Sequence, residues 1–484
     1  MLHKDFIERT RKLLRGEYDS FEAALDTQPP VSIRINPFKQ DGIPVKDNFI
    51  TDNTENIPWC ETGRYLAERP SFTFDPLFHA GIYYVQEAAS MFTEQAVKII
   101  LEDDGIRSKQ IAALDLCAAP GGKSTLLQSL LPPDSLLVSN EVIRSRSMIL
   151  AENLAKWGLP NNIVTNNDPK DIGELTHVFD IILADLPCSG EGMFRKDIAS
   201  RDEWSIDNVK LCAGRQRRII HDAWNALKPG GYLIYSTCTF NTEENEENVY
   251  TLAGELRAEI IPIPIKEEWN IASTLCHDIP VYRFFPHHTK GEGFFLALLR
   301  KSSCTTGDNR TKDKKYLELK EPVFTKTSRE TGRKKTNRLN NKPAVSEQVK
   351  NMILNPGKFT FYDTNNIFAL PSIHDNLLKN LSEQLNIISA GITLGEYKGS
   401  DFIPFVSLAL STVINTGSFP TVALSREQAI KYLQREAITL PGDTPKGHVI
   451  VTFGNKPLGF VKNIGNRANN LYPQEWRIRS RSFI

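Results

Sequence analysis

Apolar runs alternate with amphipathic segments through the middle of the chain, from about residue 110 to residue 300. This alternation is typical of a parallel sheet with helices on both faces, joined by right-handed crossovers. The pattern predicts strands over residues 111–116, 136–140, 162–166, 179–184 and 232–237, and helices over 121–131, 144–157 and 205–227. The expected fold class is therefore α/β, with a doubly wound, Rossmann-like sheet.

The segments that flank this region have different patterns. Runs 279–285 and 293–299 are joined by a short connection, which favours an antiparallel hairpin at the sheet edge. Residues Phe6 to Leu14 predict a helix, residues Ser32 to Pro37 alternate like a short strand, and Gly447 to Val461 predict a β-hairpin. We expect an α+β N-terminal domain over 1–95, a central domain over 96–302, a basic flexible linker over 303–348, a small spacer domain over 349–425 and a β-rich C-terminal domain over 426–484.

The charges cancel over the whole chain, with 58 Lys and Arg against 58 Asp and Glu, but they are unevenly distributed. Residues 301–345 hold 13 basic and 5 acidic residues, and residues 456–484 hold 6 and 1. Such segments can neutralise nucleic-acid phosphates, although a solvated linker has the same composition. No run approaches the roughly 18 apolar residues that indicate a membrane span, and the seven cysteines lack a disulfide-type spacing. We therefore expect a cytoplasmic, monomeric protein without a membrane partner.

A glycine turn follows the first strand of the central domain. Gly121 and Gly122 open a helix, but the dinucleotide and P-loop patterns are absent, which disfavours NAD and ATP. The next strand ends at Glu141, where a carboxylate can bind a ribose diol, and the third ends near Asp168, which can accept a hydrogen bond from an adenine amino group. Glu141 alone would also fit a solvated acid at a helix start. Together, a ribose site and an adenine site without a pyrophosphate motif indicate S-adenosylmethionine.

Two cysteines follow the ends of later strands: Cys188 in the run Asp185 to Gly190, and Cys238 in the run Ser236 to Phe240. C5 of a pyrimidine is not nucleophilic, so an enzyme first adds a thiolate to C6, which activates C5 toward the sulfonium methyl group. Either thiol alone is more often a packing residue, but two at strand ends favour this chemistry. The residues do not rank the two thiols, and the loop of Cys188 is where DNA enzymes place their nucleophile.

Two charged residues are expected to support this chemistry. Asp185 is placed to hydrogen-bond a base edge, and its acid form would support protonation at cytosine N3. Lys123 would add positive charge, because a free thiol is only weakly ionised near neutrality.

The remaining cysteines and the adjacent histidines do not form a recognisable metal-binding or catalytic motif. Neither Cys276-His277 nor His287-His288 has paired metal-ligand spacing, so we expect no metal. We interpret the remaining thiols outside the glycine loop as structural: Cys60, Cys212, Cys276 and Cys304.

These motifs resemble the Nol/Nop/Sun family of RNA cytosine-5 methyltransferases, most closely its bacterial ribosomal RNA branch. The matching stretches are Leu114 to Lys123, Asn140-Glu141, Asp185 to Gly190, Ser236 to Phe240, Arg283 to His287 and Lys290 to Phe295, with Ser32 to Pro37 and Tyr84 to Glu87 similar to N-terminal signatures. Specific motifs cover residues 1–300, and the likeness over 350–484 is looser.

The resemblance implies a class I methyltransferase sheet and a C-terminal PUA-like RNA-binding module after the spacer. It implies that Cys238 attacks C6 and that Cys188 assists release of the methylated product. The cofactor contacts that it implies are Cys117, Ala118, Ala119, Pro120, Gly121, Gly122, Lys123, Glu141, Asp168 and Asp185.

The activity implied is S-adenosylmethionine-dependent formation of 5-methylcytosine in small-subunit ribosomal RNA, through a covalent cysteine–C6 adduct. The base must leave its stack to reach the thiol, which favours single-stranded or loop RNA. One alternative is a transfer RNA substrate, because the same motifs would serve it. The other is a non-catalytic RNA-binding protein of ribosome assembly, which predicts a degraded cofactor loop or a lost thiol, and this chain retains both.

Overall fold

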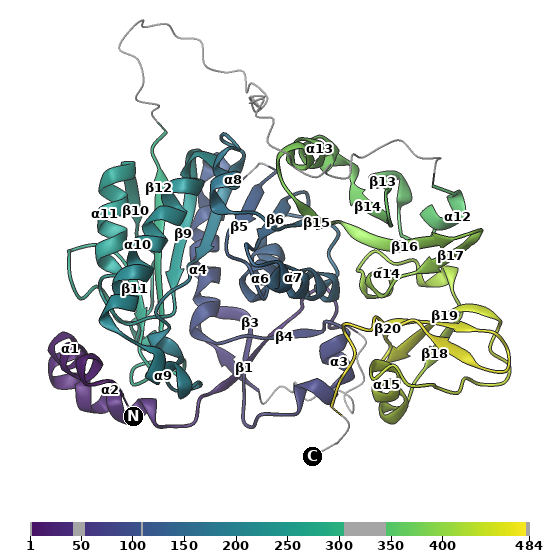
Figure 1. Cartoon of the computed structure of the whole chain (residues 1–484), viewed down its shortest axis with the longest axis horizontal. Coiled ribbons are helices and arrows are strands. Elements are labelled where there is room, and N and C mark those ends of the chain that lie inside the picture. The colour runs from purple at the N-terminus through teal and green to yellow at the C-terminus, as the bar shows by residue number, and fades with distance from the viewer. Residues whose placement is uncertain (1, 42–53, 108–109, 304–344, 481–484) are drawn as a thin grey trace, which may run out of the picture.

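The computed structural model describes residues 2–41, 54–107, 110–303 and 345–480, and Figure 1 shows their arrangement. The basic flexible linker predicted over 303–348 falls mainly on residues 304–344, which lie outside the described residues, as does Cys304. In the described part of the chain, no helix has the length and apolar character needed to cross a membrane.

A nine-stranded sheet forms the centre of the protein, in the order β10-β12-β9-β8-β5-β6-β7-β15, with β11 paired to β12. Its parallel strands are β5 (Ala112–Asp115), β6 (Leu136–Asn140), β7 (Asn162–Thr165), β8 (Phe179–Asp185) and β9 (Leu227–Thr237). These confirm the five predicted strands. They could be predicted because strands covered on both faces are apolar along their whole length.

Helices cover both faces of this sheet. One core contains Ile181 and Leu183 of β8 with α4 (Thr93–Glu102) and α6 (Gly122–Leu130). The other contains Ile182 and Ala184 of β8 with α8 (Pro169–Gly173), α10 (Ile206–Ala223) and α11 (Glu246–Leu256). Successive residues of β8 thus point to opposite faces, as strand geometry requires. The remaining helices of this region are α5 (Asp104–Arg107), α7 (Arg144–Trp157) and α9 (Ala199–Glu203).

Two boundaries differ from the prediction. The helix predicted to reach residue 227 ends at Ala223, and β9 begins at Leu227. The Lys228 to Gly231 run, which looks like a helix stop, lies inside β9 opposite an irregularity in the register with β8. The predicted hairpin is present, because β11 (Tyr282–Phe284) pairs antiparallel with β12 (Phe294–Lys301), and β10 (Ala258–Ile261) adds a further edge strand.

The N-terminal region combines a helical hairpin with a small sheet. The hairpin is α1 (Lys4–Leu14) and α2 (Tyr18–Leu25), and the sheet has the order β2-β3-β1-β4. The bounds are β1 (Val31–Ile35), β2 (Glu55–Ile57), β3 (Cys60–Leu66) and β4 (Tyr83–Val85), with α3 (Pro76–His79) before β4. Phe6 and Phe21 of the hairpin pack against Phe194, Phe240 and Phe285 of the central region, which places α1 and α2 beside α9 (Figure 1).

Two further sheets form the C-terminal part. The first contains β13 (Phe359–Asp363), β14 (Ile367–Pro371), β16 (Ile392–Lys398) and β17 (Asp401–Pro404), with α12 (Glu347–Lys350), α13 (Asp375–Gln384) and α14 (Val406–Leu410) nearby. The second contains β18 (Thr421–Ala423), β19 (Gly447–Phe453), β20 (Lys456–Asn463) and β21 (Ala468–Asn470), with α15 (Arg426–Leu433). The predicted hairpin over 447–461 is the β19–β20 pair.

Strand β15 (Ile387–Ala390) joins the spacer segment to the central sheet. It pairs antiparallel with β7, and Asn166 N–H donates to the carbonyl oxygen of Asn386 over 3.0 Å. The sequence pattern did not predict this pairing across the boundary between the central and spacer domains. The pairing covers the open edge of β7, which would otherwise expose unpaired backbone groups.

Candidate active site

The two strand-end thiols lie side by side at the carboxyl edge of the sheet. Asp185 of β8 is in register with Ser236 of β9, so the loops after these strands are neighbours. The Sγ atoms of Cys188 and Cys238 are 3.0 Å apart, and both cysteines are free. The sheet topology therefore brings both predicted catalytic cysteines into one site.

A lysine and a carboxylate lie beside this pair. Lys123 Nζ donates to Asp185 Oδ2 over 2.8 Å, and Ser236 Oγ donates to Asp185 Oδ1 over 2.8 Å. Burial alone would lower the pKa of Lys123, but the charge of Asp185, its hydrogen bond and the proximity of Cys238 outweigh burial and raise that pKa. Both oxygens of Asp185 therefore accept hydrogen bonds from neighbouring side chains, which fix the position of its carboxyl group in the site.

The surroundings of the two thiols have opposite charge. Lys123 interacts electrostatically with Cys238, whereas Glu244 interacts electrostatically with Cys188. The pKa of Cys188 lies well above its usual value, first because of the hydrogen bond with Cys238, then because of burial and the negative groups nearby. The anion near Cys188 favours the thiol form of that residue. The site therefore distinguishes the two cysteines electrostatically.

Glu244 is a site residue that sequence reasoning missed. Its carboxylate is fully buried, and it accepts hydrogen bonds from Ser189 N, Gln216 Nε2 and Asn241 Nδ2 at 3.0, 2.7 and 2.8 Å. Burial raises the pKa of Glu244. These contacts tie the Cys188 loop to the chain after Cys238. The sequence shows only an acidic stretch at a helix start, so nothing in it separates the buried acid from its exposed neighbours.

The glycine loop runs from the end of β5 to the start of α6. Gly121 has φ 116°, a backbone conformation that favours glycine, at the N-cap of α6. Arg146 Nη2 donates to the carbonyl oxygen of Ala119, and Asn153 Nδ2 donates to that of Pro120, each over 2.8 Å. Burial raises the pKa of Cys117 in the same loop, so its thiol is protonated and unreactive.

Arg34 of β1 supports this loop from the N-terminal region. Its side chain is fully buried. The Nε atom donates to Gln86 Oε1 over 2.9 Å, and Nη2 donates to Thr125 Oγ1 over 2.5 Å. The guanidinium lies 4.4 Å from the centroid of the Trp157 ring. Burial lowers its pKa to about 10, which leaves it charged near neutrality. Sequence alternation identified the strand around Arg34 but did not indicate that its charge is buried against the cofactor loop.

Asp115 at the end of β5 is a second missed residue. Its Oδ2 accepts from Ser124 Oγ over 2.7 Å, while its buried Oδ1 has no hydrogen-bond partner among the described residues. Burial raises the pKa of Asp115 to about 7. A buried carboxylate oxygen without a donor suits a cationic ligand group, such as the ammonium of S-adenosylmethionine.

The predicted ribose and adenine carboxylates follow the next two strands. Glu141 is buried after β6, where Oε1 accepts from Ile143 N over 2.9 Å and Oε2 lies 3.4 Å from Arg146 Nη1. Asp168 is exposed after β7 and begins α8 by accepting from Lys170 N over 3.0 Å. Asn140 joins these segments, because its Nδ2 donates to the carbonyl oxygens of Leu116 and Asn167. The carboxylates along these strand ends fit the donor groups of S-adenosylmethionine.

The thiols that we interpreted as structural and that the structure describes are Cys60, Cys212 and Cys276, and Cys212 interacts electrostatically with Glu244 and Cys238. Cys60 and Cys212 are buried, and burial raises the pKa of each. Burial also raises the pKa of Cys276, to about 11.

Comparison with known proteins gives concordant matches along the chain. Residues 106–300 match the family model for 16S rRNA methyltransferase RsmB/F. Residues 2–88 match the model for the N-terminal domain of 16S rRNA methyltransferase RsmF, and residues 419–478 match the model for the methyltransferase RsmF PUA domain. Ribosomal RNA small subunit methyltransferase F of Aliivibrio fischeri (strain MJ11) is 31% identical over 471 residues, with 94% of this chain and 93% of the relative covered. The protein of that name from Escherichia coli O139:H28 is 29% identical over 472 residues, with coverage of 95% and 92%.

Solved structures show the same fold. A methyltransferase homolog protein from Pyrococcus horikoshii is 28% identical, with a TM-score of 0.52 and coverage of 62% of this chain and 95% of that one. NSun6 from Pyrococcus horikoshii, solved with an S-adenosylmethionine analogue, is 20% identical, with a TM-score of 0.50 and coverage of 62% and 98%. The cofactor of this chain is S-adenosylmethionine. The chain belongs to the RsmF family of S-adenosylmethionine-dependent ribosomal RNA methyltransferases.

Proposed function

We propose that this protein methylates C5 of a cytosine in small-subunit ribosomal RNA through a covalent adduct between Cys238 and C6. The observation that carries the proposal is the pair of thiols 3.0 Å apart, with Lys123 near Cys238 and Glu244 near Cys188. A thiol pair of this kind suits C5 methylation of a pyrimidine, because the base needs a nucleophile at C6 and a proton carrier at C5.

In the first step, Cys238 as thiolate forms a bond to C6, and the electron density shifts toward C5 and N3. Lys123, held by Asp185, stabilises the thiolate before the attack and places positive charge near the base. The bound cofactor supplies an electrophilic methyl group on a sulfonium.

Release requires the C5 proton to leave while the bond between Cys238 and C6 breaks. Cys188 is a thiol at rest because its pKa is raised, and it lies next to the departing sulfur. It can donate its proton to the sulfur of Cys238 while it takes up the C5 proton, which leaves both cysteines as thiols.

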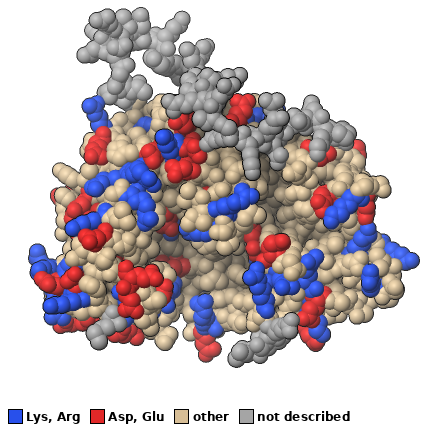
Figure 2. Space-filling model, in the orientation of Figure 1, with Lys and Arg blue, Asp and Glu red and all other residues tan. Residues whose placement is uncertain are grey.

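The C-terminal module supplies a second contact for RNA. A cavity of about 490 Å³ there is lined by three exposed arginines, Arg435, Arg467 and Arg477, together with amide side chains such as Gln474. Guanidinium and amide donors suit phosphate and base edges. The face drawn in Figure 2 mixes basic and acidic side chains. We assign the phosphate contacts of the C-terminal module to the arginine-lined cavity.

The substrate is tested by transfer of tritium-labelled methyl groups from S-adenosylmethionine to purified 16S ribosomal RNA, small subunits and transfer RNA in separate reactions. We expect label in the ribosomal substrates, at positions that bisulfite sequencing identifies as 5-methylcytosine. Label in transfer RNA alone would favour the transfer RNA alternative, and no label in any RNA would favour a non-catalytic role. We further propose that the protein acts as a monomer in the cytoplasm, where its substrate resides.

A further inference from the structure

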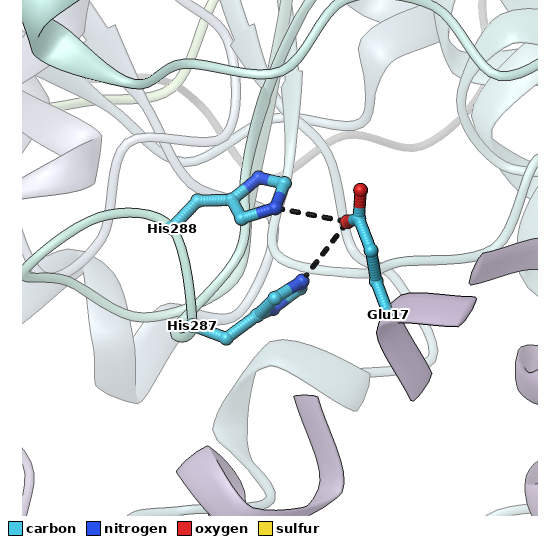
Figure 3. A group of neighbouring side chains, drawn as sticks. All are labelled: Glu17, His287 and His288. Atoms are coloured by element: carbon cyan, nitrogen blue, oxygen red, sulfur yellow. Dashed lines mark hydrogen bonds and ion pairs between the residues drawn. The ribbon is translucent and has the colours of Figure 1, made fainter. Parts of the chain in front are cut away.

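Three potential metal ligands from distant parts of the chain converge beside the N-terminal hairpin. Glu17 Oε2 lies 3.3 Å from His287 Nε2 and 2.9 Å from His288 Nε2, as Figure 3 shows. Glu17 lies between α1 and α2, whereas the histidines follow β11. The spacing of two adjacent histidines did not predict a metal site, because the third ligand comes from the N-terminal hairpin.

The donor set is the one that zinc uses where it keeps an open position: two imidazole nitrogens and one carboxylate oxygen. Bonds of the usual zinc length place neighbouring tetrahedral ligands about 3.3–3.4 Å apart. The nitrogen–oxygen separations of 3.3 and 2.9 Å are close to this value, and all three ligand atoms lie within 4.8 Å of one another. Coordination would require the two imidazole nitrogens, now within 4.8 Å of each other, to reach the same spacing.

Burial and access also fit an ion. The side chains of His287 and His288 are 7% and 24% exposed, whereas that of Glu17 is 57% exposed. One side of the group is therefore held by the protein, and the other is open to a water ligand and to entry of the ion.

The position of the group connects the N-terminal hairpin to the segment next to the thiols. His287 lies two residues after Phe285, whose ring stacks on that of Phe240 with 5.5 Å between centroids. Phe240 lies two residues after Cys238 and also contacts Phe21 of α2. A metal ion bound by Glu17 and the two histidines would therefore fix α1 and α2 against this group of aromatic rings.

We propose that Glu17, His287 and His288 form a binding site for one transition-metal ion of the Zn²⁺ class, which fastens the N-terminal hairpin to the catalytic region. The proposal does not depend on the identity of the RNA substrate.

The test uses the full chain, freed of metal with a chelator and titrated with Co²⁺ and then Zn²⁺. We expect one ion per chain, a cobalt visible spectrum of four- or five-coordinate type, and an unfolding temperature that rises with Zn²⁺ concentration. Glu17→Gln and His288→Ala should each weaken binding at least about tenfold, the lower end of the losses seen when ligand surroundings are altered. Glu17 is exposed, so its substitution leaves the fold intact, which circular dichroism and S-adenosylmethionine binding would verify.

A matched control is His221→Ala. His221 Nε2 lies 2.8 Å from Glu255 Oε2, but this exposed pair has only one imidazole. Its loss should leave binding unchanged. Absence of a bound ion, or binding that survives combined Glu17→Gln and His288→Ala substitution, would overturn the proposal. An intense near-ultraviolet thiolate-to-cobalt band would place the ion on the cysteines and would also overturn it.

Discussion

Asp115 should make binding of the cofactor's amino-acid part depend on pH. Its buried Oδ1 has no hydrogen-bond partner among the described residues, and burial raises its pKa to about 7. A cationic ligand needs the ionised carboxyl, so binding must include deprotonation of Asp115 at low pH. The pKa of this carboxyl is raised above its ordinary value, so affinity should rise as pH rises through about 7 and then level off.

The size of the effect follows from the fraction ionised. With a pKa of about 7, roughly a tenth of Asp115 is ionised at pH 6 and roughly nine tenths at pH 8. S-adenosylhomocysteine, which keeps the ammonium, should therefore bind about tenfold more tightly at pH 8 than at pH 6. Asp115→Asn should bind it more weakly, with the same Kd at both pH values.

Isothermal titration calorimetry on the full chain provides the assay. 5′-Methylthioadenosine is the control ligand, because it lacks the amino-acid part and should bind equally at pH 6 and pH 8. An affinity for S-adenosylhomocysteine that is flat or falls between these pH values would refute the reasoning. A pH dependence that persists in Asp115→Asn would assign the titration to another group.

Three further predictions concern catalysis, stability and RNA binding. Cys188→Ala should accumulate a covalent protein–RNA complex, visible as a slow band on a denaturing gel, because release loses its proton carrier. Arg34→Ala should lower the free energy of unfolding by roughly 3 kcal/mol in urea titrations, because buried hydrogen bonds and ring packing are lost. The control is Arg11→Ala, at an exposed position, which should change the free energy of unfolding by less than about 0.5 kcal/mol. The double variant Arg467→Glu, Arg477→Glu should weaken RNA binding and make that binding less dependent on salt, while the Kd for S-adenosylhomocysteine stays unchanged. An unaltered salt dependence would exclude the arginine-lined cavity of the C-terminal module as a phosphate contact.

The parallel strands and the positions of the two thiols could be predicted because both depend on local pattern. A strand buried on both faces is a continuous apolar run, and the carboxyl ends of parallel strands meet at one edge of the sheet. Cys188 and Cys238 therefore had to be neighbours once the strands before them, β8 and β9, were recognised. The motif resemblance then supplied the division of roles, which local pattern alone left open.

The features that were missed depend on contacts between distant segments. Strand β15 pairs with β7, which lies more than two hundred positions earlier, and a four-residue run carries no sign of its partner. Glu244 and Arg34 resemble ordinary surface charges in sequence, because burial of a charge is decided by the elements that cover it. Glu17 meets His287 and His288 only after α1 and α2 pack on the catalytic region.

The central claim is that Cys238, and not Cys188, forms the bond to the cytosine. The most direct measurement is peptide mapping by mass spectrometry of the complex formed with S-adenosylmethionine and a substrate RNA that carries 5-fluorocytosine, which prevents release. We expect a nucleotide adduct on the peptide that contains Cys238, formed by the wild type and by Cys188→Ala and absent from Cys238→Ala. An adduct on Cys188, or one that survives in Cys238→Ala, would contradict the account.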